Sequence, residues 1–471
     1  MSAETRGLTG LTIPELGRLL RGGKTTATAL ATIALQRLEE DGRRLNAVVT
    51  LMPEIAMAQA ERAETELAQG IDRGPLHGIP YGAKDLLATA GVPTTWGAAP
   101  LRDQHFDTDA TVIRRLEEAG AVLVAKLAMV EFAGGFGYQQ PDAALTGPGK
   151  NAWDESAWAG GSSSGSGAAV AAGAVPFAIG SETWGSITTP ACFNGVTGLR
   201  PTYGRVSRSG AMALSWSMDK LGPIARTAED CALVLAAIAG PDPHGSTTLH
   251  HQPFIWPPPV AAARFRIATA RGRKSAADPE VEAVFTRSLE TLRAIGSIEE
   301  IDLPDLPYAA AATTIIAAEA AAAFQEFLES GRAAGLTAPE DRSGLFHGLA
   351  IPAVDYLRAL RIRRLAESAL ANALAPFDAL VAPTNQRVAP PLSARFDAYY
   401  EKSDDTVIGA ADNICGLPGL TVPNGIGDRG LPTGLTLIGR AGTDERLLDL
   451  ASQYQSLTDW HEQRPPARMI H

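Results

Sequence analysis

The sequence predicts an α/β protein in which helices alternate with the strands of a largely buried sheet. Apolar residues recur at helical spacing in several segments, and continuous apolar runs of about five residues lie between them. The order of helix and then strand repeats along the chain. With 471 residues and 45% hydrophobic content, the chain can bury a large core, either as two domains or as one large α/β domain.

Helices and strands are expected in turn along the first half of the chain. Near the N-terminus, charges lie between apolar residues at helical spacing, so residues 1–70 are expected to form a helical cover. A turn and a short buried strand that contains one lysine, Lys84, follow at residues 75–85. The helices expected in this half are 11–20, 27–38, 56–67, 110–118 and 168–173, and the strands are 121–125 and 175–179.

Two irregular segments interrupt this alternation. Residues 133–161 are rich in Gly, Pro, Gln and Trp, which predicts a long ordered loop of the kind that usually carries function. Residues 241–259 contain His, Ser, Thr and several prolines, and they form either a surface excursion or a domain boundary. The elements expected after them are helices at 309–328, 354–374 and 444–457 and strands at 377–382, 420–423 and 435–439.

The composition excludes several classes of function. A net charge of −11 and 6% aromatic residues do not fit a basic nucleic-acid-binding surface. The three cysteines, Cys192, Cys231 and Cys415, predict neither a disulfide framework nor a zinc site. No stretch approaches the roughly 20 apolar residues of a membrane span, and residues 1–6 precede no signal-peptide core. We therefore expect a cytoplasmic protein that binds neither nucleic acid nor membrane.

Two loops rich in serine and glycine flank one short apolar segment. The loops are residues 159–167 and 180–187, and the segment between them predicts a buried helix that ends near Gly173 and then a buried strand. A helix of about ten residues and a strand of about five cover similar lengths. If the strand returns alongside the helix, both loops lie at one end of the pair, and Ser162 and Ser186 share one site.

Ser186 is the candidate nucleophile of that site. It directly follows a turn, and successive backbone N–H groups in such a turn can converge on one oxygen and stabilise an oxyanion. A serine hydroxyl also needs a base near pH 7. No histidine lies between residues 106 and 243, so the base is not expected to be a histidine close in sequence.

Lys84 is the candidate base. The residues before it, 79–83, are apolar or small, and burial there would lower the pKa of the amine until it could take a proton from a serine and return it to a leaving amine. Ser162 is placed to relay the proton. A competing motif, Gly-Ser-Ser-Ser-Gly at 161–165, matches a nucleophile elbow with Ser163 as the nucleophile, but no strand is expected before it.

These motifs resemble those of the amidase signature family. The family has a Gly-Ile-Pro-x-x-x-Lys-Asp motif, a Gly-Gly-Ser-Ser-Gly-Gly-Ser loop, a helix of small residues, and a Gly-Gly-Ser-Ile nucleophile motif. The similarity spans nearly the whole chain. The matching segments are 78–85, 160–166, 180–190, 195–202, 417–423 and 434–439.

The resemblance implies an amidase signature fold, which is a large central mixed β-sheet covered by α-helices on both faces. The chain would be a single catalytic domain with an N-terminal helical cover at 1–70, a signature core at 75–235 and a surface excursion at 241–260. No metal or cofactor is implied. The partners would be a small-molecule substrate and water, and the resemblance also allows a homodimer.

The resemblance also implies catalytic roles for individual residues. Ser186 would be the acylated nucleophile, Lys84 the general acid and base, and Ser162 the bridging serine, which a cis peptide bond holds in the family. The reaction would be hydrolysis of a carbon–nitrogen bond other than a peptide bond, through an acyl-enzyme. The oxyanion hole would consist of the backbone N–H groups of Thr183, Trp184, Gly185 and Ser186.

The chain departs from the family pattern around the nucleophile. Trp184 replaces a glycine, and its ring is expected to enter the pocket wall. Glu182 and Thr188 replace the usual Asp and Arg, so a supporting ion pair is expected to be missing. Leu127 and Ala128 replace a common Thr-Asn pair. These departures argue against the glutamine-hydrolysing subunit of a tRNA amidotransferase.

The substrate loop is expected at residues 132–139, with Ala133, Gly134, Gly135 and Phe136 as substrate-binding residues. Together with Trp184, its aromatic residues suggest a neutral, aryl-bearing amide or carbamate. Alternatively, they only pack the loop, because aromatic side chains mostly serve packing. An esterase and a non-catalytic or amidotransferase-type subunit on the same fold remain the rival functions.

Overall fold

The computed structural model describes residues 11–466 except 138, 246, 251, 260–263, 272–276, 397–398 and 400–406. Within these residues, one mixed sheet of 11 strands runs through the molecule in the order β1-β3-β2-β4-β6-β5-β10-β11-β9-β7-β8. The strands are β1 (Val48–Leu51), β2 (Pro80–Lys84), β3 (Val122–Leu127), β4 (Phe177–Glu182), β5 (Thr197–Arg200), β6 (Lys220–Ala225), β7 (Phe265–Ala270), β8 (Gly296–Ile301), β9 (Ala379–Pro383), β10 (Gly419–Ile426) and β11 (Pro432–Ile438).

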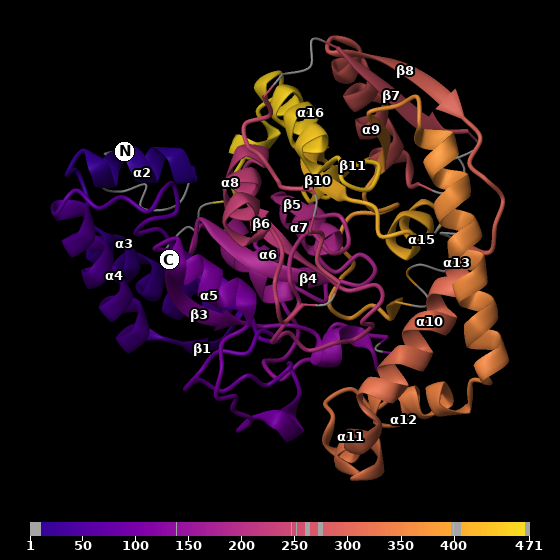
Figure 1. Cartoon of the computed structure of the whole chain (residues 1–471), viewed down its shortest axis with the longest axis horizontal. Helices are drawn as coiled ribbons and strands as arrows, with labels where there is room; N and C mark the ends of the chain where they lie inside the picture. The colour runs from indigo at the N-terminus through magenta and orange to yellow at the C-terminus, as the bar shows by residue number, and fades with distance from the viewer. Residues whose placement is uncertain are drawn as a thin grey trace.

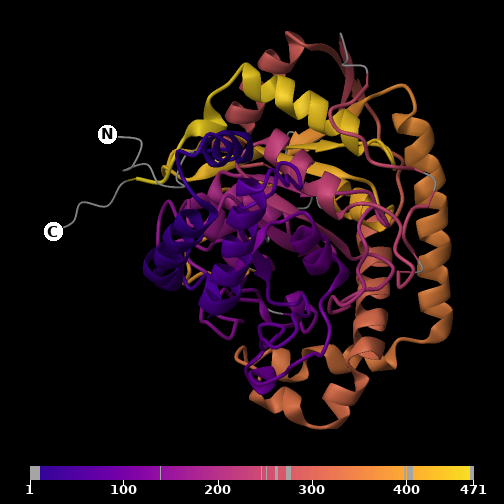
Figure 2. The ribbon, with the colours of Figure 1, turned by 60° about the vertical axis from the view of Figure 1, so that its left-hand side comes forward.

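Helices cover both faces of the sheet, as predicted (Figures 1 and 2). The first three lie together at one end of the molecule, and α10 and α13 run side by side at the other (Figure 1). The helices are α2 (Ile13–Arg21), α3 (Ala27–Arg37), α4 (Pro53–Ala68), α5 (Thr111–Glu118), α6 (Ser164–Ala171), α7 (Thr188–Asn194), α8 (Ala228–Ile238), α9 (Pro279–Arg293), α10 (Tyr308–Ala323), α11 (Gln325–Glu329), α12 (Asp341–Gly344), α13 (Ala353–Leu374), α15 (Val407–Ile414) and α16 (Asp444–Ser456).

The sheet is parallel around β2, the strand that carries Lys84. Strand β2 pairs in parallel with both β3 and β4, and every residue of these three strands is buried. Tyr81 of β2 stacks on Phe177 of β4 with ring centroids 5.2 Å apart. The C-terminal ends of neighbouring parallel strands lie on the same side of a sheet, so the ends of β2 and β4 lie together.

Helix α6 is buried on all sides because its residues are small. All eight of its residues, from Ser164 to Ala171, are buried. A Cβ at Gly165 would lie 2.4 Å from the Ala47 carbonyl oxygen, and one at Gly167 would lie 2.8 Å from the Pro190 carbonyl oxygen. Glycine therefore allows α6 to pack closely against its neighbours, next to the two serine loops.

Two elements differ from the sequence prediction, and one irregular segment agrees with it. The expected helical cover contains one strand, β1, which pairs with β3 at the edge of the sheet. The helix expected at 309–328 is two helices, because Phe324 leaves the helical conformation with φ −111° and ψ 16°. Residues 241–259 carry no helix or strand among those described, and strands on both sides of this segment belong to the same sheet. No helix among the described residues is long and apolar enough to cross a membrane.

Candidate active site

Lys84 is the last residue of β2, and its side chain is fully buried. Its Nζ donates hydrogen bonds to the hydroxyls of Ser162 and Ser181, both at 2.8 Å. Burial lowers the pKa of Lys84 to about 7, although the charges of Asp219 and Glu182 act in the opposite direction. A substantial share of the amine is therefore neutral near pH 7 and can accept a proton.

Ser162 lies in the bend before α6 and is fully buried. The Gly161–Ser162 peptide bond is cis. A Cβ at Gly161 would lie 2.8 Å from Val130 Cγ2 and 2.9 Å from the Trp158 ring, so a side chain there would displace its neighbours. The tightly packed bend holds the Ser162 hydroxyl beside the Lys84 amine.

Ser186 lies in the loop between β4 and α7, where it is 7% exposed. Its carbonyl oxygen accepts a hydrogen bond from the backbone N–H of Ser163 at 3.2 Å. The two serine loops therefore meet, in the arrangement that the helix and strand lengths predict. The structure brings the loop of Ser186 against the bend that carries Ser162, while Lys84 reaches the same bend from β2.

Ser163, the alternative nucleophile, is fully buried and ties the two loops together. Its hydroxyl donates to the Ser181 carbonyl oxygen at 3.2 Å and accepts from the Ser181 backbone N–H at 3.2 Å. No strand precedes it directly in the described chain. A hydroxyl that is enclosed and engaged in this way fits a structural role and not a nucleophile elbow.

Ser181 is a site residue that the sequence analysis did not single out. It contacts Lys84 because β2 and β4 are parallel neighbours, with Ala83 opposite Ile179, so that both strands end beside each other. The signal in the sequence is its place in the nucleophile motif, five residues before Ser186. Only the strand pairing shows that its hydroxyl lies against the amine.

The expected loss of an ion pair near the nucleophile is wrong. Glu182 Oε1 accepts a hydrogen bond from Arg200 Nη1 at 2.7 Å, and Arg200 Nη2 binds Asp412 at 2.7 Å. Arg200 comes from β5, a strand that begins three residues after α7 ends. Burial alone would raise the pKa of Glu182, but Arg200, Lys220 and the Thr188 N–H together lower it to about 2.

Glu182 also holds the start of α7. Its Oε2 accepts hydrogen bonds from the backbone N–H groups of Ile187 at 2.8 Å and Thr188 at 2.9 Å. A carboxylate at a helix N-terminus satisfies N–H groups that have no partner within the helix. The ion pair therefore fixes the backbone on both sides of the loop that carries Ser186.

The residues before Ser186 form the loop that the resemblance assigns to the oxyanion hole. The Thr183 hydroxyl donates to Asp219 Oδ1 at 2.6 Å, which anchors the first residue of the loop. Gly185 has a φ of +84°, a conformation that favours glycine. Within the described part of the chain, the backbone N–H groups of Trp184, Gly185 and Ser186 donate to no other group, as an oxyanion hole requires.

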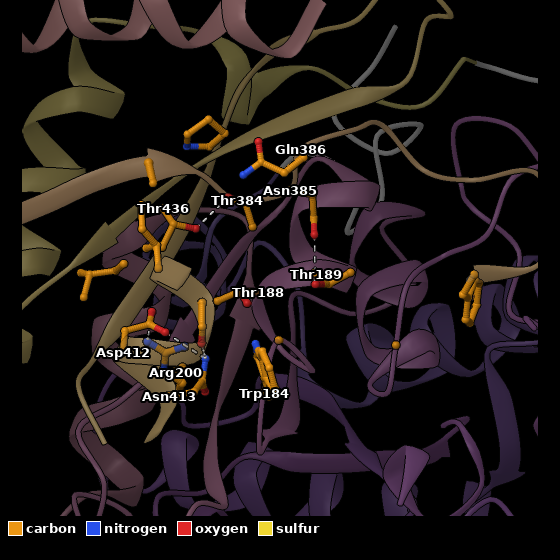
Figure 3. Close-up of a pocket in the computed structure, with 18 of the residues that line it drawn as sticks. Trp184, Thr188, Thr189, Arg200, Thr384, Asn385, Gln386, Asp412, Asn413 and Thr436 are labelled. Carbon is orange, nitrogen blue, oxygen red and sulfur yellow. Dashed lines mark hydrogen bonds and ion pairs between the residues drawn. The ribbon is translucent and has the colours of Figure 1, made fainter. Parts of the chain in front are cut away.

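A cavity of about 460 Å³ lies beside this loop (Figure 3). Its wall combines the nucleophile loop, the loop after β9, and α15. Trp158, Trp184 and Phe396 supply aromatic surface, and the Trp184 ring lies in the wall as expected. Arg200 also lines the cavity, but its charge is balanced by Glu182 and Asp412. The cavity therefore offers aromatic and uncharged polar surface.

The expected substrate loop packs mainly against the protein. Phe132 and Phe136 are fully buried, with ring centroids 4.6 Å apart, and Phe132 also contacts Phe324 at 4.8 Å. Phe136 lines neither of the two cavities beside the nucleophile loop. The geometry thus favours packing, the second of the two interpretations, for these rings.

Ala133 is the member of this loop that does line a cavity. It borders a second space of about 590 Å³ that also reaches Ser181 and Thr183. The next two residues, Gly134 and Gly135, carry the chain past Leu214, whose Cδ1 would lie 2.3 Å from a Cβ at Gly135.

In the described part of the chain, no group of three or more His, Cys, Asp or Glu side chains could hold a metal ion.

The chain is similar over nearly its whole length to proteins of one family. The Amidase family profile matches residues 29–448. A glutamyl-tRNA(Gln) amidotransferase subunit of Roseiflexus sp. (strain RS-1) is 38% identical over 487 residues, covering 97% of this chain and 98% of that protein. The same subunit of Halorhodospira halophila is 37% identical, covering 96% of this chain and 98% of that protein.

Solved structures show the same relationship. The peptide amidase of Stenotrophomonas maltophilia has a TM-score of 0.82 at 32% identity, covering 98% of this chain and 99% of that one. A second chain was solved in a study of a vestigial protein complex and the origins of an s-triazine catabolic enzyme. It has a TM-score of 0.85 at 31% identity, covering 95% of this chain and 98% of that one. The chain therefore belongs to the amidase family, and its fold is that of the amidase signature enzymes.

Proposed function

We propose that this protein hydrolyses an amide-type carbon–nitrogen bond through an acyl-enzyme on Ser186. The observation that carries the proposal is the buried contact of 2.8 Å between Lys84 Nζ and the Ser162 hydroxyl. The lowered pKa of Lys84, about 7, supplies a base and an acid at neutral pH without a histidine. We assign Ser162 as the relay to Ser186, because the backbone N–H of its neighbour Ser163 donates to the Ser186 carbonyl oxygen.

The first half of the reaction forms the acyl-enzyme. Ser186 Oγ attacks the carbonyl carbon of the substrate while its proton passes to Ser162, and the Ser162 proton passes to the neutral Lys84 amine. The negative charge on the carbonyl oxygen is stabilised by the N–H groups of the loop 183–186. The carbon–nitrogen bond then breaks, and the leaving amine receives a proton back through Ser162 from Lys84.

The second half releases the acid. A water molecule attacks the ester carbonyl of the acyl-enzyme and gives its proton to Lys84 through Ser162. The bond between the acyl carbon and Ser186 Oγ breaks, and Ser186 recovers its proton by the same route. The ion pair of Glu182 and Arg200 supports both halves, because it keeps the loop backbone in one shape.

The substrate that we propose is an uncharged, aryl-bearing amide or carbamate whose acyl half occupies the 460 Å³ cavity. Trp158, Trp184 and Phe396 supply the aromatic surface, and the balanced charge of Arg200 favours a neutral group. A panel of aryl amides, aryl carbamates, aryl esters and short aliphatic amides tests this. A preference for short aliphatic amides would contradict the aromatic pocket, and hydrolysis confined to esters would favour the esterase.

A fluorophosphonate probe tests the nucleophile directly. We expect the probe to label the wild type and the Ser163→Ala variant, but not Ser186→Ala. Labelling of the Ser186→Ala variant would show that the nucleophile is another residue. If the wild type is folded but not labelled, and no substrate of the panel is hydrolysed, the non-catalytic subunit becomes the better interpretation.

A second candidate function is that of an amidotransferase subunit. The identity of 38% to the glutamyl-tRNA(Gln) amidotransferase subunit of Roseiflexus sp. over nearly the full length favours it, whereas the departures at Trp184 and Thr188 argue against it. Glutamine hydrolysis that appears only when other subunits are added would support this function. Hydrolysis of aryl amides by the purified chain alone would support the free-standing amidase. Light scattering of the same sample would show whether the chain forms the homodimer that the resemblance allows.

A further inference from the structure

Trp184 places an indole N–H on the wall of the 460 Å³ cavity. The residue belongs to the nucleophile loop, and Figure 3 shows its nitrogen on the inner side of the ring, toward the other lining residues. A Cβ at Gly409 of α15 would lie 3.4 Å from Trp184 Nε1, so the nitrogen lies over a residue without a side chain. Among the described residues, no group accepts a hydrogen bond from this N–H.

Gln386 supplies a second donor across the same cavity. It follows β9 in the chain, and Figure 3 shows its amide nitrogen turned toward the lining residues and its oxygen turned away. The oxygen, Oε1, is enclosed and accepts no hydrogen bond from the described residues. The amide nitrogen also has no acceptor among the residues that the structure describes, so it can donate to a molecule in the cavity.

Several acceptors on the same wall are already engaged. Each of three lining residues receives a hydrogen bond at its side-chain oxygen from a neighbouring side chain. These acceptors are Asp412, which binds Arg200 at 2.7 Å, Asn413, which binds Lys220 at 3.2 Å, and Asn385, which binds Thr189 at 3.3 Å. The N–H groups of Trp184 and Gln386 have no such partner among the described residues, and they complement an oxygen that accepts.

The charges on the cavity wall favour a bound molecule whose oxygen carries no formal charge. Arg200 contacts the carboxylates of both Glu182 and Asp412, so its positive charge is already compensated. A substrate carboxylate would lose its water in the cavity without gaining a free cation, which is costly. A carbonyl group loses less on desolvation and can accept a hydrogen bond from either N–H.

We propose that Trp184 and Gln386 are specificity residues that select an acyl group bearing a second, uncharged carbonyl oxygen. This inference rests on the proposed function, because it takes the acyl half of the substrate to lie in this cavity. It concerns the indole N–H of Trp184 and not its backbone N–H. It predicts that the protein prefers substrates whose acyl group carries a ketone, an ester or a further amide over alkyl analogues of equal size.

Matched benzamides test the preference. Acetylbenzamide carries the carbonyl, isopropylbenzamide has the same shape without it, and carbamoylbenzoate carries a charge, and each is used as its 3- and 4-isomer. From ammonia release, we expect kcat/KM for the better acetyl isomer to exceed that of its isopropyl analogue about 5- to 10-fold, as for one neutral hydrogen bond. The carboxylate should be the poorest of the three. Equal rates for the acetyl and isopropyl compounds would overturn the inference.

Two variants connect the preference to the residues. Trp184→Phe keeps an aromatic ring and removes the N–H, and Gln386→Leu removes the amide at similar volume. Both are expected to reduce the ratio of the acetyl to the isopropyl rate to about 2- to 3-fold, since one of the two donors is lost and the other remains. Trp460→Phe and Gln36→Leu make the same exchanges outside the cavity and should keep the wild-type ratio. An unchanged ratio in both cavity variants would overturn the inference.

A binding measurement distinguishes a failure of this inference from a failure of the proposed function. Calorimetric titration of Ser186→Ala with the same acetyl and isopropyl compounds measures the preference without turnover. If the preference appears in binding and falls with Trp184→Phe in the Ser186→Ala background, the subsite stands even where the wild type hydrolyses none of the compounds. If the wild type hydrolyses them and binding shows no preference, the hydrolase stands and the subsite fails.

Discussion

Lys84 and Ser162 lie 78 positions apart in the chain, and their amine and hydroxyl meet at 2.8 Å in a fully buried site. The parallel pairing of β2 with β4 brings the amine to the edge of the sheet at which the chain enters α6. Burial disfavours the ammonium form there, so the enclosed site prepares the amine for proton transfer.

Replacement of Lys84 by alanine should affect amides more than esters. Without the amine, Ser186 loses its base and the leaving amine loses its proton donor, so amide hydrolysis is expected to fall at least about 100-fold. An ester leaving group needs less protonation, and its rate should fall less. Steady-state kinetics on an aryl amide and its ester analogue measure the difference, with the exposed Lys24→Ala as the control. Equal losses on both substrates would contradict the acid role of Lys84.

The rate of amide hydrolysis should rise with pH around neutrality. Lys84 must be neutral to accept a proton and its pKa is lowered to about 7, so kcat/KM is expected to rise as pH increases through about 7. The Ser181 hydroxyl stabilises the ammonium form through its hydrogen bond at 2.8 Å.

Removal of this hydroxyl tests the assignment of the pH profile to Lys84. Ser181→Ala should lower the pKa of Lys84 further and move the midpoint to lower pH, whereas Ser181→Thr should keep it near the wild-type value. The measurement is kcat/KM from pH 5 to 9. A midpoint that is the same in all three proteins would show that another group controls the rate.

Loss of Arg200 should strongly destabilise the fold. Arg200→Met leaves the buried carboxylates of Glu182 and Asp412 without their cation, which is expected to lower the free energy of unfolding by about 3–5 kcal/mol. The matched control is Arg271→Met, which breaks an exposed pair with Asp302 and should cost about 0–1 kcal/mol. Urea unfolding compares the two variants. Similar losses in both would mean that the buried ion pair adds no stability.

The buried carboxyl group of Asp341 predicts that the stability of the fold depends on pH. Burial, and then contact with Glu131, raise the pKa of Asp341 to about 9, with smaller effects from Glu340 and Asp142. The folded protein therefore holds a proton on Asp341 that the unfolded chain releases near its ordinary value of 3.8. The stability from this group is fully present below that value and is lost as pH rises toward 9.

Asp341→Asn should remove this dependence, because asparagine resembles the protonated acid at every pH. We expect the variant to gain stability relative to the wild type between pH 5 and pH 9, measured by urea unfolding. The exposed Asp302→Asn should show no such gain. If the difference in stability between the wild type and Asp341→Asn does not change with pH, Asp341 is not protonated in the fold.

The sequence by itself determined the catalytic chemistry that we propose and most of the elements that carry it. Helices such as α5 and α16 and strands such as β3 follow from local periodicity, since each buries one face or both. The meeting of the two serine loops also follows locally, because α6 and β4 are consecutive elements joined by a short connection.

Only the tertiary structure decided what surrounds the nucleophile. Arg200 reaches Glu182 from a different strand, and Gln386 enters the cavity wall some 200 positions after Ser186, so neither contact leaves a periodic signal. The rings of Phe132 and Phe136 could pack or bind equally well by composition, and the position of Phe324 decides between these roles. Local patterns specify which residues are buried, but long-range packing specifies what each of them contacts.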